Sequence, residues 1–375
     1  MYDLIIKQAK LIDGTITDIA VLNGKIAEIG SISAPAKKEF DLKAQHYISA
    51  GWIDAHTHTF AKSPIYHDEP DLAGVYSGVT TVIDAGSVGA NDIDCFYQLA
   101  KQAKTHVYAL LNISKIGLIR QNELADMHDI DQALFDQAIA NYPDFIVGIK
   151  ARMSKSVVGQ NGLAPLITAK AFQKKYDLPL MIHVGNTPPD LDDIAEVLTK
   201  GDIITHCFNG KPNQILTPAG ELREAIKRAL ARGVVLDVGH GGESFSFRVA
   251  EKSKALGIYP MTISSDIYGK NRTNGPVYSL ANVMTKFLCL DYQKSQIIDC
   301  VTKHAAEMLH LHNKGQLIVG YDADLTIYDL IPEATLLSDA EGKQRVAQER
   351  FVPLAATIMG EIVLTQEGSK YDFSL

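Results

Sequence analysis

Two histidines separated by a single residue, His56 and His58, offer the clearest chemistry in this chain. They end an apolar stretch that begins at Tyr47, and residues two apart in an extended strand point to the same side. Both imidazoles can therefore converge on one point, as a pair of metal ligands requires. Imidazole suits zinc and other borderline first-row ions. Because His-x-His also occurs by chance in many chains, the remaining ligands must come from elsewhere in the sequence.

Further ionisable side chains stand at the far ends of other apolar runs. Lys150 and Arg152 end the run 145–153, His183 ends 179–185, His206 ends 202–209 together with the neutral amide of Asn209, and Asp266 ends 261–266. Burying such groups is costly unless they are paired, hydrogen-bonded or bound to a metal. One case would be uninformative, because a lone histidine on an apolar run is often a satisfied core residue. The repetition at the same end of several runs predicts a shared site.

These positions require a scaffold that brings distant strand ends together. Eight short apolar runs are candidate strands: 47–56, 80–86, 106–114, 145–153, 179–185, 202–209, 234–241 and 261–266. Segments with helical periodicity, such as 165–176, lie between them. This alternation matches a (β/α)₈ barrel, and the length of the segment is close to the roughly 250 residues typical of that fold. Active sites of such barrels lie at the carboxyl ends of the strands. We therefore predict an α/β fold, with a catalytic TIM barrel over residues 49–315.

The two ends of the chain have a different pattern. Residues 1–48 contain short strand-like runs separated by Asp-Gly and Asn-Gly turns at 13–14 and 23–24, which are hairpin signals. The runs 323–329 and 356–364 are also of strand length. We expect residues 1–48 and 316–375 to form one small β-sandwich domain together.

The amino-acid composition argues against some classes of binding partner for this protein. Hydrophobic residues are 46% of the chain and the formal net charge is −8, so there is no electrostatic footprint for nucleic acid. There is no apolar run long enough for a bilayer, and the first residues lack the apolar core of a signal peptide. The four cysteines have no C-x-x-C spacing, which is typical of reduced thiols. We expect a cytoplasmic protein that acts on a small molecule, without nucleic-acid or membrane partners.

The order of the polar residues resembles the binuclear pattern of the amidohydrolase superfamily. That pattern has His-x-His on the first strand, Lys on the fourth, His on the fifth and sixth, and Asp on the eighth. The segment 48–58 resembles the family's opening "PG-(I/W)-ID-x-H-x-H", with Ala50 in place of its proline. The segment 77–86 resembles its second strand, and 315–325 resembles its return into the small domain. The resemblance extends over the whole chain.

The resemblance implies a role for each of these residues. His56 and His58 would bind the more buried of two divalent ions, most simply zinc, together with Asp266. His183 and His206 would bind the more exposed ion. Lys150 would be carboxylated by CO₂, and its carbamate would bridge both ions. A hydroxide held between the metals would attack the substrate, with Asp266 as general acid–base.

Five residues are candidate substrate contacts: Arg152, Asn209, His240, Tyr268 and Arg272. Arg152 shares a strand face with Lys150 and can hold a carboxylate or phosphate with two hydrogen bonds. A salt bridge at the barrel rim remains the alternative for Arg152, and a turn role remains the alternative for Asn209 and His240. The turn-rich stretch 210–220 is expected to form a mobile lid over the site.

Departures from subfamily patterns rank the possible reactions. Dihydroorotases and hydantoinases usually carry an arginine where this chain has Phe60, and deaminases carry a glutamate that is absent after His183. The chain looks most like the deacetylase-type metallohydrolases, which implies hydrolysis of an acyl amide or ester of a small, anionic metabolite. An adenine deaminase-like aminohydrolase and a dihydroorotase-like cyclic amidohydrolase remain the alternatives. A non-catalytic relative would typically have lost metal ligands, whereas this chain keeps them, and homo-oligomers are common among such enzymes.

Overall fold

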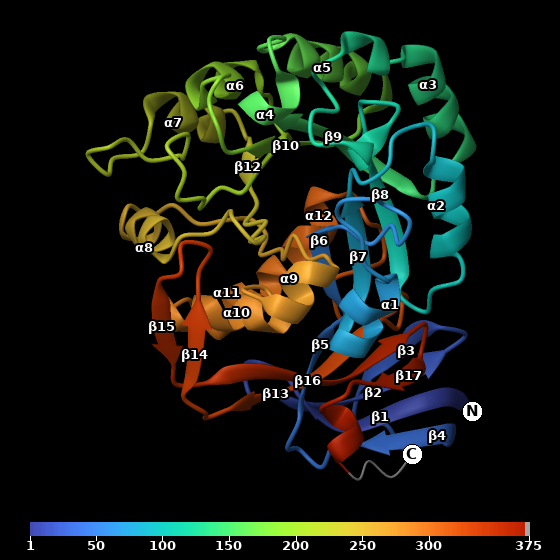
Figure 1. Cartoon of the computed structure of the whole chain (residues 1–375). Coiled ribbons are helices and arrows are strands. Elements are labelled where there is room, and N and C mark those ends of the chain that lie inside the picture. Colours follow the sequence, from blue (N-terminus) through green and yellow to red (C-terminus); the bar gives the residue numbers. More distant parts are fainter. Residues whose placement is uncertain (372–375) are drawn as a thin grey trace.

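A curled parallel sheet forms the centre of the protein in the computed structural model, which describes residues 1–371 (Figure 1). Its strands, in chain order, are β6 (Trp52–Thr57), β7 (Val79–Ala85), β8 (His106–Asn112), β9 (Ile146–Met153), β10 (Leu180–Val184), β11 (Ile203–Thr205) and β12 (Val235–Leu236). Each strand pairs with the next one along the chain. Strands β6 and β7 are buried at every residue, as expected for parallel strands with both faces covered.

The run 261–266 closes this sheet into a ring without forming a regular strand. The amide of Asp266 donates to the carbonyl of His56 over 2.7 Å, and the amide of His58 donates to Ile267 over 2.8 Å. On its other side, Val238 donates to Thr262 over 3.1 Å. The segment therefore lies between β12 and β6 in the place of an eighth strand, and we call it the eighth stave of the barrel. The predicted (β/α)₈ barrel is confirmed.

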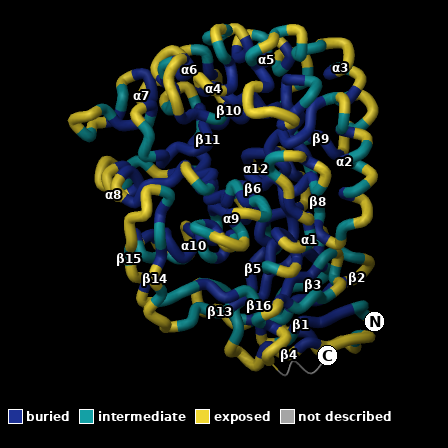
Figure 2. Tube along the Cα trace, viewed as in Figure 1, coloured by how far each residue is buried: buried dark blue, intermediate teal, exposed yellow. Residues whose placement is uncertain are grey.

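Helices surround the ring, and Figure 2 shows that their outer sides are exposed while the central strands are buried. They are α1 (Pro70–Ala73), α2 (Ile93–Ala100), α3 (Gln132–Asn141), α4 (Lys155–Val158), α5 (Ala164–Tyr176), α6 (Leu191–Val197), α7 (Glu224–Ala231), α8 (Phe247–Ala255), α9 (Gly269–Asn274), α10 (Leu280–Cys289), α11 (Lys294–Cys300) and α12 (Lys303–Met308). The segment predicted to be helical at 165–176 is α5. Within residues 1–371, there is no helix that combines the length and the apolar character needed to cross a lipid bilayer.

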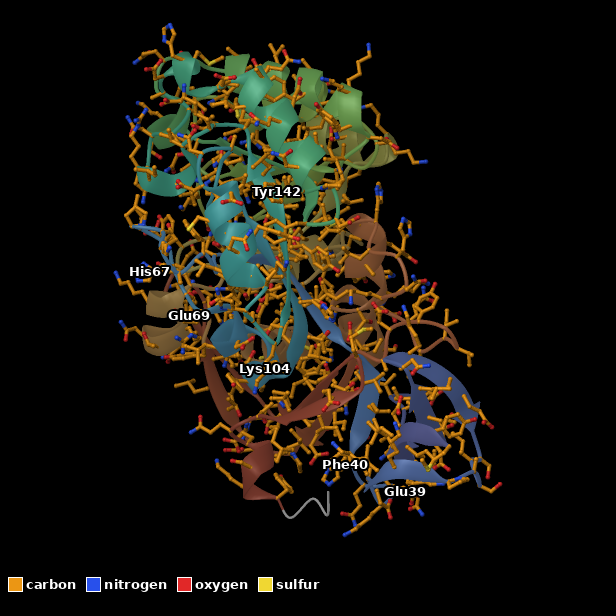
Figure 3. The ribbon with its side chains drawn as sticks, turned by 90° about the vertical axis from the view of Figure 1, so that its right-hand side faces the viewer. Glu39, Phe40, His67, Glu69, Lys104 and Tyr142 are labelled. Carbon is orange, nitrogen blue, oxygen red and sulfur yellow. The ribbon has the colours of Figure 1, made fainter. Side chains whose placement is uncertain are left out.

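Both ends of the chain contribute to a second, eight-stranded sheet. Its strands are β1 (Tyr2–Lys10), β2 (Ile16–Leu22), β3 (Lys25–Gly30), β4 (Ala36–Asp41), β5 (Tyr47–Ala50), β13 (Leu325–Ile331), β16 (Arg350–Ile358) and β17 (Glu361–Leu364). Antiparallel pairing of β5 with β13 joins the two ends. Strands from both ends share one apolar core, which contains Ile6, Phe40, Leu325 and Leu354. Figure 3, a side view, places Glu39 and Phe40 of this sheet at one end of the molecule and Tyr142, after α3, in the barrel.

Part of the predicted C-terminal domain segment leaves the small sheet. The hairpin of β14 (Thr335–Ser338) and β15 (Gln344–Ala347) is a separate two-stranded sheet. Arg345 on the hairpin pairs with Glu251 of α8 at 2.8 Å, and the Asp339 carboxylate accepts from the amide of Phe247 over 2.9 Å. These polar contacts hold the hairpin against the barrel, although the hairpin belongs to the segment 316–375 that was expected in the small domain.

A buried polar cluster couples the barrel to the small sheet. The Asp324 carboxylate, just before β13, lies 3.1 Å from His106 Nε2 of β8 and 2.5 Å from Lys314 Nζ. It also accepts from the amide of Met359 over 2.9 Å. Burial by itself would raise the pKa of Asp324, but His106 and Lys314 outweigh burial and lower it to about 2. The ionised carboxylate is therefore stabilised by folding.

We expect Asp324→Asn to destabilise the fold by about 3 kcal/mol near neutral pH, because it removes the charge that faces the buried Lys314 ammonium and the His106 ring, and leaves Lys314 with Asp322 alone, at 2.9 Å. A carboxylate whose pKa is lowered on folding stabilises the protein above its unfolded pKa of about 3.9, and this contribution is lost as pH falls toward 2. The difference from the unmodified protein should therefore shrink between about pH 4 and 2.

Thermal or urea unfolding over this pH range measures the effect. Asp193→Asn, at an exposed position on α6, is the control and should show no comparable loss. A destabilisation by Asp324→Asn that is constant from pH 7 to pH 2 would contradict the ionic role of this carboxylate.

Candidate metal centre and its cavity

The six side chains predicted as metal ligands all line one cavity of about 180 Å³. His56 and His58 come from the end of β6, Lys150 from β9, His183 from β10, His206 from the residue after β11, and Asp266 from the eighth stave. The strands are parallel, so their carboxyl ends meet at the same edge of the barrel. The structure thus brings together residues that are up to 210 positions apart in the sequence, from His56 to Asp266.

Close contacts link these side chains into a cluster. Oδ1 of Asp266 lies 3.1 Å from His58 Nε2 and 3.4 Å from His56 Nε2. The ligand atoms of these three residues lie within 4.8 Å of one another, a spacing that fits a single cation. Nζ of Lys150 is 3.2 Å from His56 Nε2. The rings of His183 and His206 form a second pair, with centroids 4.5 Å apart.

Burial sets the charges of these donors in the way that metal binding requires. It lowers the pKa of His56 and His183 well below the usual value and that of His206 to about 4, so these imidazoles are neutral at pH 7. A neutral imidazole has a free lone pair for a metal ion. For Asp266, the hydrogen bond and charge of His58 outweigh burial and keep the pKa low. Neutral nitrogens beside an ionised carboxylate form a suitable donor set for divalent ions.

Lys150 lies in surroundings that disfavour its ammonium form. Its side chain is 1% exposed, and its Nζ contacts His56 Nε2 and the sulfur of Met181 at 3.3 Å. The ion pairs among residues 1–371 include none for this ammonium. Burial lowers the pKa of Lys150 to about 7, so a large fraction is a neutral amine at physiological pH. A neutral amine is the form that reacts with CO₂, and the resulting carbamate would bring an anion to a cluster of neutral imidazoles.

A network behind the cluster holds His56 in place. His56 Nδ1 lies 2.9 Å from the Thr205 hydroxyl, which donates to Asp237 Oδ2 over 2.6 Å. Asp237 also accepts from the hydroxyls of Thr262 and Ser264, both within 2.8 Å. With Nδ1 engaged, Nε2 faces the cavity. Sequence reasoning missed this network, although a polar residue within an otherwise apolar strand, as Asp237 is, was an available signal.

The other histidines are oriented in the same way from behind. His58 Nδ1 lies 2.8 Å from the hydroxyl of Ser87, and His206 Nδ1 lies 2.6 Å from the carbonyl of Gly239. The amide of Ser87 donates to Asp84, whose other oxygen accepts from the amide of Phe60 over 3.3 Å. The Phe60 ring, 6% exposed, packs on Phe96 in the barrel core. Position 60 thus faces away from the cavity.

The backbone around the cluster approaches the ligands very closely. His206 and Asp266 have φ of 62° and 51°, a region that L-residues seldom adopt and that is found at functional sites. Gly239 has φ of 46°, and a Cβ there would lie 2.2 Å from Thr205 Oγ1, 2.9 Å from His206 Nδ1 and 3.0 Å from His56 Nδ1. Only glycine allows this approach. These turns also explain why β12 is shorter than the predicted run 234–241.

Two of the five predicted substrate contacts, Arg152 and Tyr268, line the cavity. The other three, Asn209, His240 and Arg272, are not among the residues that line it. Asn209 holds the turn after β11, donating to the His206 carbonyl over 2.9 Å. His240 is buried behind the cavity, with Nε2 at 2.7 Å from Lys286 Nζ, and Arg272 pairs with Asp68 at 2.6 Å. The partner of Asn209 lies in its own turn, whereas Lys286 belongs to α10 and Asp68 lies in the loop after β6, so strand-end position alone did not reveal these contacts.

Several lining residues were not among the sequence-based candidates. The polar ones include Tyr66, Gln121, Ser154, Asn186, Lys211 and Glu243. They come from loops that follow the strands, where the sequence has no periodicity to mark them. Lys211 lies in the stretch 210–220 that was expected to cover the site. His67, by contrast, is exposed on the loop beside α9, at the edge of the view in Figure 3.

Comparisons with known proteins agree with this architecture. A family model described as a deacetylase-like composite domain matches residues 317–363. A protein named deacetylase from Enterococcus faecalis is 48% identical over 364 residues, covering 96% of this chain and 99% of its own length. A solved structure titled as an adenine deaminase is 48% identical with a TM-score of 0.96, covering 97% of this chain and 100% of that one. Another, titled as a dihydroorotase, is 33% identical with a TM-score of 0.89, covering 97% and 98%.

We expect Gly239→Ala to reduce metal binding by about 10–100-fold or more, because the new methyl group displaces His56 or His206 from its orienting contact. Gly257→Ala is the matched control: Gly257 has φ of 75°, but a Cβ there meets nothing within 4 Å. Both variants carry the same kind of backbone strain, of about 1 kcal/mol.

Metal content after dialysis against a graded series of chelator concentrations, together with the thermal midpoint, separates the two effects. Both variants should lose a little stability, and only Gly239→Ala should lose metal. Equal metal retention by the two proteins would contradict the close-approach argument.

Proposed function

This chain belongs to the amidohydrolase superfamily, among its deacetylase-like members, and from this premise we propose that it removes an acyl group from the nitrogen or oxygen of a small, anionic metabolite. The observation that carries the proposal is the convergence of four imidazoles, one amine and one carboxylate in a single cavity. The deacetylase-named relatives, at 48% and 36% identity, support acyl cleavage as the reaction.

We assign the metal ligands as the sequence predicted them. His56, His58 and Asp266 would hold one divalent ion, His183 and His206 the other, and Lys150, carboxylated by CO₂, would link them; zinc suits the imidazoles. When bound, the two ions would make hydroxide available at neutral pH and polarise the carbonyl of the substrate. This donor set is chemically consistent, because the carbamate supplies the anion that two dications and neutral imidazoles otherwise lack.

The protein's own groups would position the substrate and move the proton. Oδ1 of Asp266 faces the two histidines, and this carboxylate would take a proton from the attacking water. It would then deliver that proton to the leaving amine or alcohol, as general acid. The rings of Tyr66 and Tyr268, with centroids 4.9 Å apart, form an aromatic wall beside these groups. A volume of about 180 Å³ limits the substrate to a small molecule.

Two other reactions are suggested by the titles of related structures. A relative at 48% identity is titled as an adenine deaminase, so aminohydrolysis is the second candidate. Hydrolysis of a cyclic amide, the dihydroorotase-like reaction, is less favoured. At the position where dihydroorotases usually carry an arginine this chain has Phe60, whose side chain is turned into the core. Four free cysteines support a reducing, cytoplasmic location, which we also propose.

Purified enzyme loaded with zinc should release acetate from N-acetyl or O-acetyl amino and hydroxy acids and should not release ammonia from adenine. The two products are measured on parallel panels by coupled assays, with a chelated sample of the enzyme as control. Ammonia from adenine at a higher kcat/KM than any acyl substrate would overturn the deacylase proposal in favour of the aminohydrolase.

Lys150→Ala should lose metal and at least about 10³-fold in kcat/KM, because the anion that links the two ligand groups is removed. A short carboxylic acid added together with metal should restore part of the activity by supplying a carboxylate in the vacated space. Metal analysis and circular dichroism distinguish loss of the site from loss of the fold. Full activity in the unrescued variant would refute the carbamate.

A further inference from the structure

The cavity contains two cationic side chains besides the ligand cluster, and they differ in how their charge is used. Arg152, whose side chain is 9% exposed, lies 3.1 Å from Glu123 Oε2, and Glu123 is completely buried. A second nitrogen of Arg152 donates to Gln121 Oε1 over 3.3 Å. Because a buried carboxylate already pairs with its charge, Arg152 is a fixed part of the cavity wall and is not available to a substrate anion.

Lys211 is held differently. Its only ion-pair partner among residues 1–371 is Glu243, with Nζ and Oε2 separated by 3.3 Å. The Lys211 side chain is 25% exposed, whereas that of Glu243 is 84% exposed. Such a solvent-exposed pair contributes only about 0–1 kcal/mol. Glu243 can therefore swing into solvent and release the ammonium at almost no cost.

The backbone of Lys211 is nevertheless fixed relative to the ligand cluster. Its amide donates to Asn209 Oδ1 over 3.0 Å, and Asn209 in turn donates to the carbonyl of His206 over 2.9 Å. The Lys211 and His183 side chains both lie against Gly185, where a built Cβ would be 3.6 Å from Lys211 Cδ and 3.7 Å from His183 Nε2. A cation with a replaceable partner thus stands beside one ligand pair, on a rigid turn.

We propose that Lys211 is a specificity-determining residue that binds the carboxylate of the substrate, with Glu243 as the anion that the substrate displaces. This proposal rests on the proposed acyl hydrolysis and narrows its substrates to acylated amino or hydroxy acids with a free carboxylate. The acyl carbonyl would lie at the ligand cluster and the carboxylate at the Lys211 ammonium. An ammonium without a competing buried partner forms charge-assisted hydrogen bonds with a carboxylate.

Two variants with opposite expected effects test this role. The probes are N-acetylalanine, which has the carboxylate, and N-acetylalaninamide, which lacks it, each as both enantiomers. Lys211→Met should lower the ratio of kcat/KM for the acid over the amide by about 10–100-fold, mostly through KM. Glu243→Gln should raise that ratio by about 2–5-fold, because the competing anion is removed.

Lys227→Met is the matched control. Lys227 forms a similar exposed pair with Glu224, at 2.6 Å, but lies on α7 and does not line the cavity. Its variant should leave the ratio as it is. Increasing ionic strength should raise KM for the acid more than for the amide in the unmodified enzyme, and this difference should be smaller in Lys211→Met.

The outcomes separate the two proposals. If the unmodified enzyme cleaves both probes and Lys211→Met lowers kcat/KM for both by the same factor, the carboxylate role of Lys211 is wrong and the acyl hydrolysis stands. If Lys211→Met and Glu243→Gln change the ratio in the same direction, their pair is structural, and the displacement proposal fails. If the enzyme cleaves neither acyl panel and instead releases ammonia from adenine, the proposed function fails, and this inference fails with it.

Discussion

Burying six ionisable side chains in one small cavity is the constraint on which the rest of this protein depends. Each of these groups would be costly to bury in its charged form and without a partner. The structure meets this cost in two ways: burial keeps three histidines and much of the Lys150 population neutral, and the one carboxylate, Asp266, contacts two imidazoles. The result is a set of nitrogen and oxygen lone pairs that face one another, and bound metal cations would occupy the space between them.

The same constraint accounts for the irregular part of the barrel. The ligand cluster needs support from behind: the Gly239 carbonyl contacts His206, the Asp266 amide donates to the His56 carbonyl, and the Gly239 backbone approaches both histidines closely. Regular strands could not make these contacts, because left-handed backbone conformations interrupt an extended ladder. Strand β12 is therefore short, and the eighth stave is held by isolated pairings. The network at Asp237 joins these two staves to His56.

Affinity for substrate depends on loops, which are under a different constraint. Arg152 and Lys211 are both cationic and both line the cavity, yet one is matched by a buried carboxylate and the other by an exposed one. A cationic side chain binds a substrate anion only if it can release the carboxylate with which it is paired. The free-energy cost of breaking that ion pair decides whether the substrate can replace the carboxylate. This distinction separates a fixed part of the wall from an exchangeable contact within one cavity.

The sequence by itself determined the barrel, the small domain built from both chain ends, and the identity and order of the ligand candidates. These features are periodic or local: strand ends recur at regular intervals, and parallel strands place those ends at one edge. Asn209, His240 and Arg272 stood at equally suitable positions, but only the tertiary structure decided that they turn to His206, Lys286 and Asp68 instead of the cavity. The tertiary structure likewise placed Thr205 and Asp237 behind His56, and it placed Lys211 in the wall of the cavity. Lys286 and Asp68 come from other elements than the residues they hold, and no spacing within one segment indicates such partners.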